Sequence, residues 1–286
     1  MNNKVNFLFT MLSFIFFASC TNPLASVEPD IEKFKTNYSQ NIQTFQGKRK
    51  IMRYAWSGNP KKRALLFIHG SPGSWDGWSQ FLLNTELQKN FHIIAIDRPG
   101  YGGSDPGNTE RLLSLQASDV IEVLKFNHSQ LPAILIGHSY GGPVIAKAAV
   151  DFPSQVAGLV FVASSVSPDL EDTKWFQIPA NWWVVRNIIP SALRVCNEEI
   201  LALKKELQSL LPDWKKINAR VVLIQGEKDT LVPPGNQKFL IDHLDSKNII
   251  KVYTIQDLNH FVPWKRPDLI IGAINILNKQ LTDDSL

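Results

Sequence analysis

Cysteine is scarce in this chain, which has only Cys20 and Cys196 among its 286 residues. So few cysteines exclude a scaffold held together by several disulfides. A chain of this length can instead bury a core large enough to fold without cross-links. Its hydrophobic fraction of 44% and charged fraction of 20% are those of an ordinary globular protein rather than a disordered one.

Long runs of one charge are also lacking. The 30 basic and 26 acidic residues are spread along the chain and give a formal net charge of +4. This pattern is typical of a solvated surface and predicts no nucleic-acid partner. The sequence shows neither a cluster of metal-ligand residues nor a nucleotide-binding loop, because the glycines near residue 100 lack the helix-opening spacing of a dinucleotide site. We therefore expect no metal and no other cofactor.

The N-terminal apolar run at residues 5–17 is too short for a comfortable membrane span but has the length of a signal-peptide core. It ends in Phe17-Ala18-Ser19-Cys20, which resembles the lipobox of bacterial lipoproteins, although Phe17 stands where Leu or a similar aliphatic residue is usual. The resemblance implies a signal peptide at residues 1–19, lipid on Cys20 and a place on a membrane of the bacterial cell envelope. The alternatives are an ordinary signal with a secreted or periplasmic product, or an uncleaved anchor.

The residues after Cys20 predict how the anchor would join the rest of the protein. Residues 20–41 are mixed and polar with Pro23 and Pro29, as expected of a lipidated tether. Lipid on Cys20 would leave Cys196 without a partner, so we expect Cys196 to pack as a small hydrophobic residue.

Beyond the tether, short continuous apolar runs alternate with helical patterns. Strands that are hydrophobic without alternation are buried on both faces, which predicts a mostly parallel sheet with helices on both sides. An antiparallel hairpin around Gly47 is expected at its edge. The expected strands are 42–45, 50–56, 64–68, 92–96, 133–136, 158–162, 220–224 and 249–253, and helical patterns lie at 112–124, 239–244 and 270–277. We expect one α/β domain at residues 42–286.

Residues 165–218 are too long for an ordinary connection between a strand and a helix. We predict a small helical lid at about residues 166–196, followed by a helix at 197–211 with Asn197 as its N-cap. The tryptophans in this insertion would then form an apolar wall that excludes water from the site. The alternative is that they pack in the core.

A serine between two glycines follows one of the predicted strands. Gly137-His138-Ser139-Tyr140-Gly141 comes directly after residues 133–136 and leads into a helical stretch at 143–150. In this context G-x-S-x-G acts as a nucleophile elbow, which exposes the serine at the carboxyl end of the strand beside a helix N-terminus. We therefore predict Ser139 as the nucleophile. The alternative is an ordinary glycine-rich turn.

A serine hydroxyl needs a base to become nucleophilic near neutral pH. Among the six histidines, His260 follows the last predicted strand. The acid that orients it is expected between Ser139 and His260, because nucleophile, acid and histidine follow in this order in proteins with such an elbow. Asp229 lies there, in the loop after residues 220–224, and is preferred over the nearby Glu227 and over Asp257.

The oxyanion of a tetrahedral intermediate needs hydrogen-bond donors, and backbone amides supply them with little reorganisation. One donor is expected to be the amide of Tyr140, directly after the nucleophile. The other should come from the loop after residues 64–68. Ser71 is best placed there, because Gly70 allows the chain to turn and Pro72 has no amide hydrogen.

Taken together, these motifs resemble the α/β-hydrolase superfamily over about residues 42–280. The loop His69-Gly70-Ser71-Pro72-Gly73 matches the oxyanion loop of that family, residues 97–105 match the turn after its fourth strand, and residues 226–233 match its acid loop. The resemblance implies a serine hydrolase that cleaves a carboxylic ester of a small molecule through an acyl-enzyme.

Departures from the family patterns narrow the activity. Epoxide hydrolases and haloalkane dehalogenases of this fold carry Asp as the nucleophile, where this chain has Ser139. Proline iminopeptidase relatives share the H-G-x-P-G loop but usually have Trp after the serine, where this chain has Tyr140. An acyltransferase, a perhydrolase or a carbon–carbon bond hydrolase would use the same triad, and a non-catalytic ligand-binding protein would use the same fold.

Replacement of Cys20 by Ser tests the predicted lipid anchor. Because the thiol would carry the lipid, Cys20→Ser should release the protein from the membrane fraction, measured by fractionation and immunoblotting. Cys196→Ser is the matched control and should stay with the membranes. Membrane association that is unchanged in Cys20→Ser would contradict the lipoprotein hypothesis.

Overall fold

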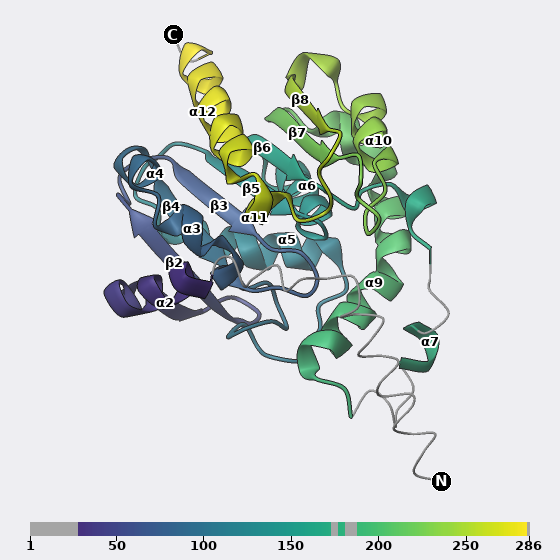
Figure 1. Cartoon of the computed structure of the whole chain (residues 1–286), viewed down its shortest axis with the longest axis horizontal. Helices are drawn as coiled ribbons and strands as arrows, with labels where there is room; N and C mark the ends of the chain where they lie inside the picture. The colour runs from purple at the N-terminus through teal and green to yellow at the C-terminus, as the bar shows by residue number, and fades with distance from the viewer. Residues whose placement is uncertain (1–27, 173–176, 181–187, 285–286) are drawn as a thin grey trace.

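The computed structural model describes residues 28–172, 177–180 and 188–284. Its strands form one eight-stranded sheet in the order β1-β2-β4-β3-β5-β6-β7-β8 (Figure 1). β1 and β2 form an antiparallel hairpin, β2 pairs antiparallel with β4, and the other pairs are parallel. The strands are β1 (Ile42–Gln46), β2 (Ile51–Gly58), β3 (Ala64–Ile68), β4 (His92–Ile96), β5 (Ala133–His138), β6 (Val156–Val162), β7 (Arg220–Gly226) and β8 (Ile249–Ile255). The predicted α/β class and mostly parallel sheet are confirmed.

Helices cover both faces of the sheet, as continuous apolar strands require. Alternate side chains of β3 show this directly, because Leu66 and Ile68 pack in one hydrophobic cluster whereas Leu65 and Phe67 pack in the other. The first cluster includes side chains of α5 (Leu113–Ile121), α6 (Gly141–Asp151), α10 (Gly235–His243) and the second half of α9 (Ser191–Leu210). The second includes α2 (Glu28–Asn37), α3 (Ser79–Leu82), α4 (Thr85–Asn90) and α12 (Pro267–Asp283).

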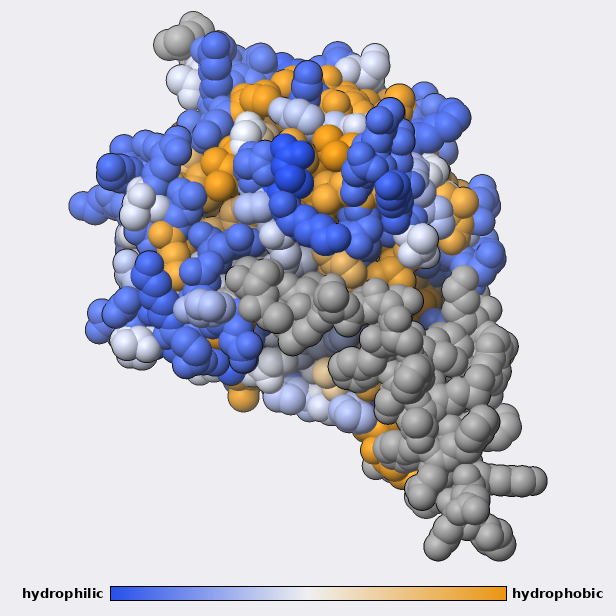
Figure 2. Space-filling view, in the orientation of Figure 1, coloured by the Kyte–Doolittle hydropathy of each residue, from blue (hydrophilic) through white to orange (hydrophobic). Residues whose placement is uncertain are grey.

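Short helical turns complete the connections between these elements. The short α-helices are α7 (Gln177–Ala180) and α11 (Val262–Lys265). The 3₁₀ turns are η1 (Ser39–Asn41), η2 (Trp75–Trp78), η3 (Glu122–Phe126), η4 (Pro153–Gln155), η5 (Pro168–Leu170), η6 (Leu211–Lys216) and η7 (Ser246–Asn248). On the face of the molecule shown in Figure 2, polar residues surround smaller apolar areas, as on an ordinary protein surface.

The order of the strands reverses between β3 and β5. The chain leaves β3 toward β4 on one side, whereas it leaves β5 toward β6 on the other. The loops after β3 and β5 therefore diverge, and in parallel sheets ligands bind in the crevice that such a reversal leaves at the carboxyl ends of the strands. The predicted oxyanion loop follows β3 and the predicted nucleophile follows β5, so the topology brings them to this one point.

The helix after the insertion begins earlier than its sequence pattern predicts. Helix α9 starts at Ser191, so Asn197 lies inside it and is not its N-cap. The Asn197 side chain instead donates a hydrogen bond to the carbonyl of Gln177 in α7, at 2.9 Å. Within the predicted lid the structure describes η5, α7 and the start of α9, whereas residues 173–176 and 181–187 lie outside the described residues.

The predicted tether is partly folded. Residues 28–37 form α2, whose Phe34 is fully buried and packs against Tyr38 and Trp75 with ring centroids 5.1 and 5.5 Å apart. The folded domain therefore starts by Glu28 rather than at residue 42. The predicted signal peptide and Cys20 lie outside the described residues. In the part of the chain that the structure describes, no helix is long and apolar enough to cross a membrane.

Replacement of Phe34 tests whether α2 belongs to the domain. Phe34→Ala removes a fully buried ring, and large-to-small core substitutions of this kind cost about 3–5 kcal/mol. We expect a loss of that size in the free energy of unfolding, measured by urea denaturation. Lys33→Ala, at an exposed position of the same helix, is the control and should change stability by less than about 0.5 kcal/mol. Equal stability of the two variants would show that α2 is not part of the cooperative unit.

Candidate active site

Ser139 lies on the sharp turn between β5 and α6. Its backbone φ is +54°, a left-handed conformation that costs a residue with a side chain about 1–3 kcal/mol. The Ser139 amide donates to the carbonyl of Val162 at 3.0 Å, and the Ser139 carbonyl accepts from the amides of Gly142 and Ser165 at 2.9 and 3.2 Å. These bonds hold the strained residue at the carboxyl end of β5, as a nucleophile elbow requires.

The two glycines of the motif allow the backbones around Ser139 to meet. A Cβ atom on Gly137 would lie 2.5 Å from the carbonyl oxygen of Gly141, and one on Gly141 would lie 2.3 Å from that of Ile68. Neither distance leaves room for a side chain. The first contact joins β5 to α6, and the second joins α6 to β3, so both glycines are required by close approach rather than by backbone conformation.

Asp229 and His260 form a direct hydrogen bond at the same edge of the sheet. Asp229 follows β7 and His260 follows β8, and the His260 Nδ1 lies 2.8 Å from Asp229 Oδ2. Both side chains are buried. With its proton on Nδ1 donated to the carboxylate, His260 keeps the lone pair of Nε2 free to accept a proton.

The Asp229 carboxylate is held by further donors. Oδ1 accepts from the amides of Leu231 and Val232 at 3.0 and 2.8 Å, and Oδ2 also accepts from the Gln225 side chain at 3.1 Å. Sequence reasoning missed Gln225. Its signal is a polar residue near the end of an otherwise apolar strand, which must find a partner when it is buried.

The two alternative acids are placed differently. Glu227 is exposed, and Asp257 is an exposed carboxylate that pairs with Lys228 at 2.6 Å. Asp229 is therefore the member of this group that contacts His260.

His138, the residue before Ser139, fixes the position of His260. The His138 Nε2 donates to the carbonyl of His260 at 3.0 Å, and the two rings lie 4.7 Å apart between centroids. Trp264 packs edge-on against the His138 ring at 5.3 Å. These contacts place His260 directly beside the turn that carries Ser139.

The loop after β3 lies against Ser139. A Cβ atom on Gly70 would lie 2.8 Å from the Ser139 Cβ, so only a glycine fits here. Among the hydrogen bonds of the described residues, none uses the amide of Ser71 or of Tyr140 as a donor. Tyr140 occupies the N-cap position of α6, where amides have no partner within the helix. The two amides of the predicted oxyanion hole are thus on neighbouring turns.

Comparison with known proteins shows the family to which this fold belongs. Residues 63–194 match the family model described as the alpha/beta hydrolase fold. The chain is 30% identical over 247 residues to the monoacylglycerol lipase ABHD6 of Bos taurus. The alignment covers 82% of this chain and 70% of that protein. The chain belongs to the α/β-hydrolase family. It is a hydrolase of that family.

Two other comparisons extend over most of the chain. The hydrolase YugF of Bacillus subtilis (strain 168), which is uncharacterized, is 26% identical over 252 residues, or 74% of this chain and 88% of that one. The structure of a bacterial membrane phospholipase A superposes with a TM-score of 0.62 over 96% of this chain and 98% of that one, at 19% identity. At that identity the second likeness shows the α/β-hydrolase fold alone.

The aromatic residues Trp75, Trp78, Phe261 and Trp264 divide into two pairs. Trp75 and Trp78 are buried in the hydrophobic cluster with Phe34 and Phe67, so they are core residues of the α/β-hydrolase domain. Trp264 is partly exposed beside His138, and the partly exposed Phe261 lies near the His260 ring. Cys196 is buried, and burial raises the pKa of its thiol to about 12, so it is an unreactive packed residue as expected.

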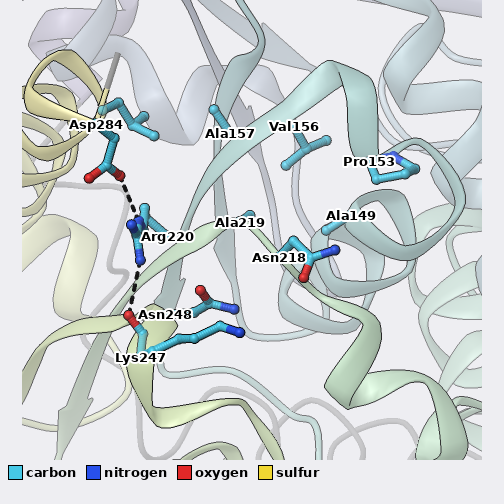
Figure 3. A pocket seen from close by; sticks show the side chains of 11 residues that line it. Ala149, Pro153, Val156, Ala157, Asn218, Ala219, Arg220, Lys247, Asn248 and Asp284 are labelled. Atoms are coloured by element: carbon cyan, nitrogen blue, oxygen red, sulfur yellow. Dashed lines mark hydrogen bonds and ion pairs between the residues drawn. The ribbon is translucent and has the colours of Figure 1, made fainter. Parts of the chain in front are cut away.

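A groove of about 620 Å³ lies at the amino ends of the parallel strands, at the end of the sheet opposite to Ser139 (Figure 3). It is lined by the first residues of β6 and β7, by residues before β8 and by the end of α12. Its Arg220 is paired with Asp284 at 2.8 Å and with the carbonyl of Lys247 at 3.0 Å. Because Ser139 lies at the carboxyl ends of the strands, this groove is not part of the candidate active site.

Burial keeps several histidines neutral. It lowers the pKa of His69 well below its usual value, and the charge of Arg98 lowers it further. The pKa of His138 is also lowered well below its usual value by burial and by the neighbouring His260. At the start of β4, burial lowers the pKa of His92 to about 4. Protonation of these rings therefore favours the unfolded chain.

His92, which is remote from Ser139, gives a clean test of this linkage. Its unfolded pKa is about 6.5 and its folded pKa about 4, so the folded state resists protonation between these values. Its contribution to stability is fully present above pH 6.5 and is lost as pH falls toward 4. Between pH 6.5 and 4 the free energy of unfolding should therefore fall less in His92→Gln than in wild type. Urea denaturation at each pH measures it.

His92→Gln must be compared with wild type, because other titrating groups change the free energy of unfolding in the opposite direction as pH falls. Burial raises the pKa of Asp119 to about 6, which favours the folded state on acidification. His243→Gln is the matched control, because it also replaces a histidine by Gln but lies on α10, where its ring contacts Phe239. If His92→Gln and wild type lose stability in parallel from pH 6.5 to 4, the ring of His92 is not a buried neutral base.

Proposed function

We propose that this α/β-hydrolase cleaves carboxylic esters of small molecules through an acyl-enzyme, with Ser139, His260 and Asp229 as the catalytic triad. The observation that carries the proposal is the buried Asp229–His260 hydrogen bond of 2.8 Å beside a left-handed Ser139. A serine nucleophile, a histidine base and a carboxylate that orients the histidine are the parts that this chemistry needs.

In the first half of the reaction, the Ser139 Oγ attacks the ester carbonyl carbon while His260 Nε2 takes the hydroxyl proton. The Asp229 carboxylate stabilises the resulting imidazolium and holds its tautomer. The amides of Ser71 and Tyr140 donate to the oxyanion of the tetrahedral intermediate. When that intermediate collapses, the bond to the alkoxy oxygen breaks and His260 returns the proton to the leaving alcohol.

In the second half, water replaces the alcohol. His260 Nε2 removes a proton from the water as its oxygen attacks the acyl carbon, and a second tetrahedral intermediate forms. Its collapse releases the carboxylic acid and returns the proton to the Ser139 Oγ. Each proton that His260 takes is given back within the same half-reaction, so the enzyme ends in its starting state.

Two considerations favour esters over other substrates of this fold. A serine at the elbow is suited to acyl transfer, whereas the epoxide hydrolases and haloalkane dehalogenases of the fold use an aspartate there. The bovine relative is a monoacylglycerol lipase, which acts on a carboxylic ester. The aromatic pair Phe261 and Trp264, partly exposed beside His138 and His260, would supply an apolar surface for the acyl or alcohol group.

The triad is tested by turnover and by active-site labelling. Wild type should hydrolyse p-nitrophenyl esters, and a fluorophosphonate probe should label it, because Oγ displaces fluoride from phosphorus. Ser139→Ala should lose labelling and lower kcat by about 10⁴-fold or more. Asp229→Asn should lower kcat by about 10⁴-fold, because the histidine then adopts the wrong tautomer.

The matched control is Asp257→Asn, which changes an exposed carboxylate on the same side of the sheet and should leave kcat unchanged. A panel of p-nitrophenyl esters of increasing chain length is compared with amino-acid anilides. Faster turnover of the anilides would replace the esterase proposal with a peptidase. Labelling of Ser139 without turnover of any substrate would favour a ligand-binding protein.

A further inference from the structure

A fully buried carboxylate from helix α9 contacts the predicted oxyanion loop. Glu199 lies in the middle of α9, far along the chain from residues 69–73, and its side chain has no exposed surface. Its Oε2 accepts a hydrogen bond from the Ser71 hydroxyl at 2.8 Å and from the Tyr101 hydroxyl at 3.0 Å. The two hydroxyls also lie 2.7 Å apart, so the three side chains are in mutual contact, and each hydroxyl donates its single proton along one of these contacts at a time.

Arg98 neutralises this carboxylate and holds the same loop. Its Nη1 lies 2.7 Å from Glu199 Oε1 and its Nη2 lies 3.1 Å from Oε2, which is a two-pronged pair with no exposed surface on either side chain. Two further donors of the guanidinium face the loop, with Nε on the His69 carbonyl at 2.9 Å and Nη2 on the Gly70 carbonyl at 2.8 Å. The Arg98–Glu199 pair therefore holds the loop through the carbonyls of His69 and Gly70 and through the hydroxyl of Ser71.

The same guanidinium touches the nucleophile turn. Arg98 lies over the Tyr140 ring at 4.6 Å from its centroid and over the Tyr101 ring at 5.0 Å. Gln116 accepts from Arg98 Nη1 at 2.7 Å and donates to the Tyr140 hydroxyl at 3.3 Å. The two residues whose amides form the proposed oxyanion hole, Ser71 and Tyr140, are thus joined through one buried polar group.

Helix α9 is in turn attached to both the core loops and the lid. Arg194 donates to the carbonyl of Gly107 at 2.9 Å, which seats the start of α9 on the loop after β4. On the lid side, Asn197 donates to the carbonyl of Gln177 in α7. The helix that carries Glu199 therefore connects the lid segment to the loop that contains Ser71.

Stability alone does not account for this pair. Removal of two charges from water is costly, and a buried ion pair can often be replaced by apolar residues of similar size without loss of stability. What apolar residues could not reproduce is the set of directed hydrogen bonds to the Ser71 hydroxyl and to the His69 and Gly70 carbonyls. Those bonds determine where the backbone amide of Ser71 points.

We propose that Glu199 is a positioning residue for the oxyanion hole. Its carboxylate holds the Ser71 side chain and orients Arg98, which holds the carbonyls of His69 and Gly70, so that the Ser71 amide faces the oxyanion. This inference rests on the proposed function. It assigns to α9 an influence on stabilisation of the transition state rather than on substrate binding.

The test compares Glu199→Gln with Glu198→Gln on a p-nitrophenyl ester. Glu198 is the matched control, because it is the adjacent buried acid of the same helix but pairs with Arg111. In Glu199→Gln we expect kcat to fall about 10- to 100-fold with KM within about twofold, since loss of a whole oxyanion donor costs roughly 10²–10³-fold. Glu198→Gln should keep the wild-type kcat.

A second measurement separates positioning from a merely structural role. The Ser139 Oγ adds to the carbonyl carbon of a trifluoromethyl ketone inhibitor. The ketone oxygen then becomes the oxyanion and occupies the oxyanion hole. Its inhibition constant should rise in Glu199→Gln by the same factor by which kcat/KM falls. A structural role would lower the melting temperature but leave both quantities at their wild-type values in the folded fraction, which is counted by fluorophosphonate labelling.

A third variant covers the case in which Glu199→Gln does not fold. Ser71→Ala removes only the hydroxyl and keeps both the amide and the Glu199–Arg98 pair, and it should lower kcat about tenfold. Where Glu199→Gln folds, the double variant should be no worse than the more impaired single variant, because both changes break one connection.

The outcomes distinguish the two proposals. Unchanged kcat and inhibitor affinity in both Glu199→Gln and Ser71→Ala, or a change in KM alone, would overturn the positioning role while the triad stands. Wild-type turnover by Ser139→Ala would instead overturn the proposed function itself.

Discussion

Two backbones approach so closely at the centre of this molecule that side chains are excluded between them. The turn after β5 meets the end of β3 at Gly141, where a Cβ would lie 2.3 Å from the Ile68 carbonyl oxygen, and it meets the following loop at Gly70, where a Cβ would lie 2.8 Å from that of Ser139. Because of this contact, the strained Ser139 and the loop that carries the Ser71 amide face each other across the reversal point of the sheet. The remaining groups of the site assemble around this junction.

The groups that assemble there are polar and buried, and each is matched by partners. Asp229 accepts from two backbone amides, from Gln225 and from His260. Arg98 and Glu199 satisfy one another and the loop after β3. An unmatched polar group in such a place would cost about 1–3 kcal/mol, so each of these buried groups needs its partners. The hydrogen bonds to those partners fix the directions of the side chains and amides that the proposed chemistry uses.

Helices α9 and α2 join the domain through contacts that local sequence does not show. Helix α9 extends back to Ser191 because tertiary contacts, with Asn197 bound to α7 and Arg194 bound to Gly107, outweigh the preference of Asn for a cap position. In the same way α2 looks like part of a polar tether, and yet one buried residue, Phe34, attaches it to the core. Single long-range contacts of this kind have no periodic signal in the sequence.

The sequence by itself determined the strands, because burial on both faces requires continuous apolar runs, and the chain bears them at each of the predicted positions. It also determined which residues stand at the carboxyl ends of β5, β7 and β8, because the elbow glycines and the order of serine, acid and histidine are local features. Only the tertiary structure decided which acid contacts His260, since Asp229, Glu227 and Asp257 differ in burial rather than in type. It alone revealed Gln225, His138 and the Arg98–Glu199 pair, because a buried polar group is recognised by partners that lie far away along the chain.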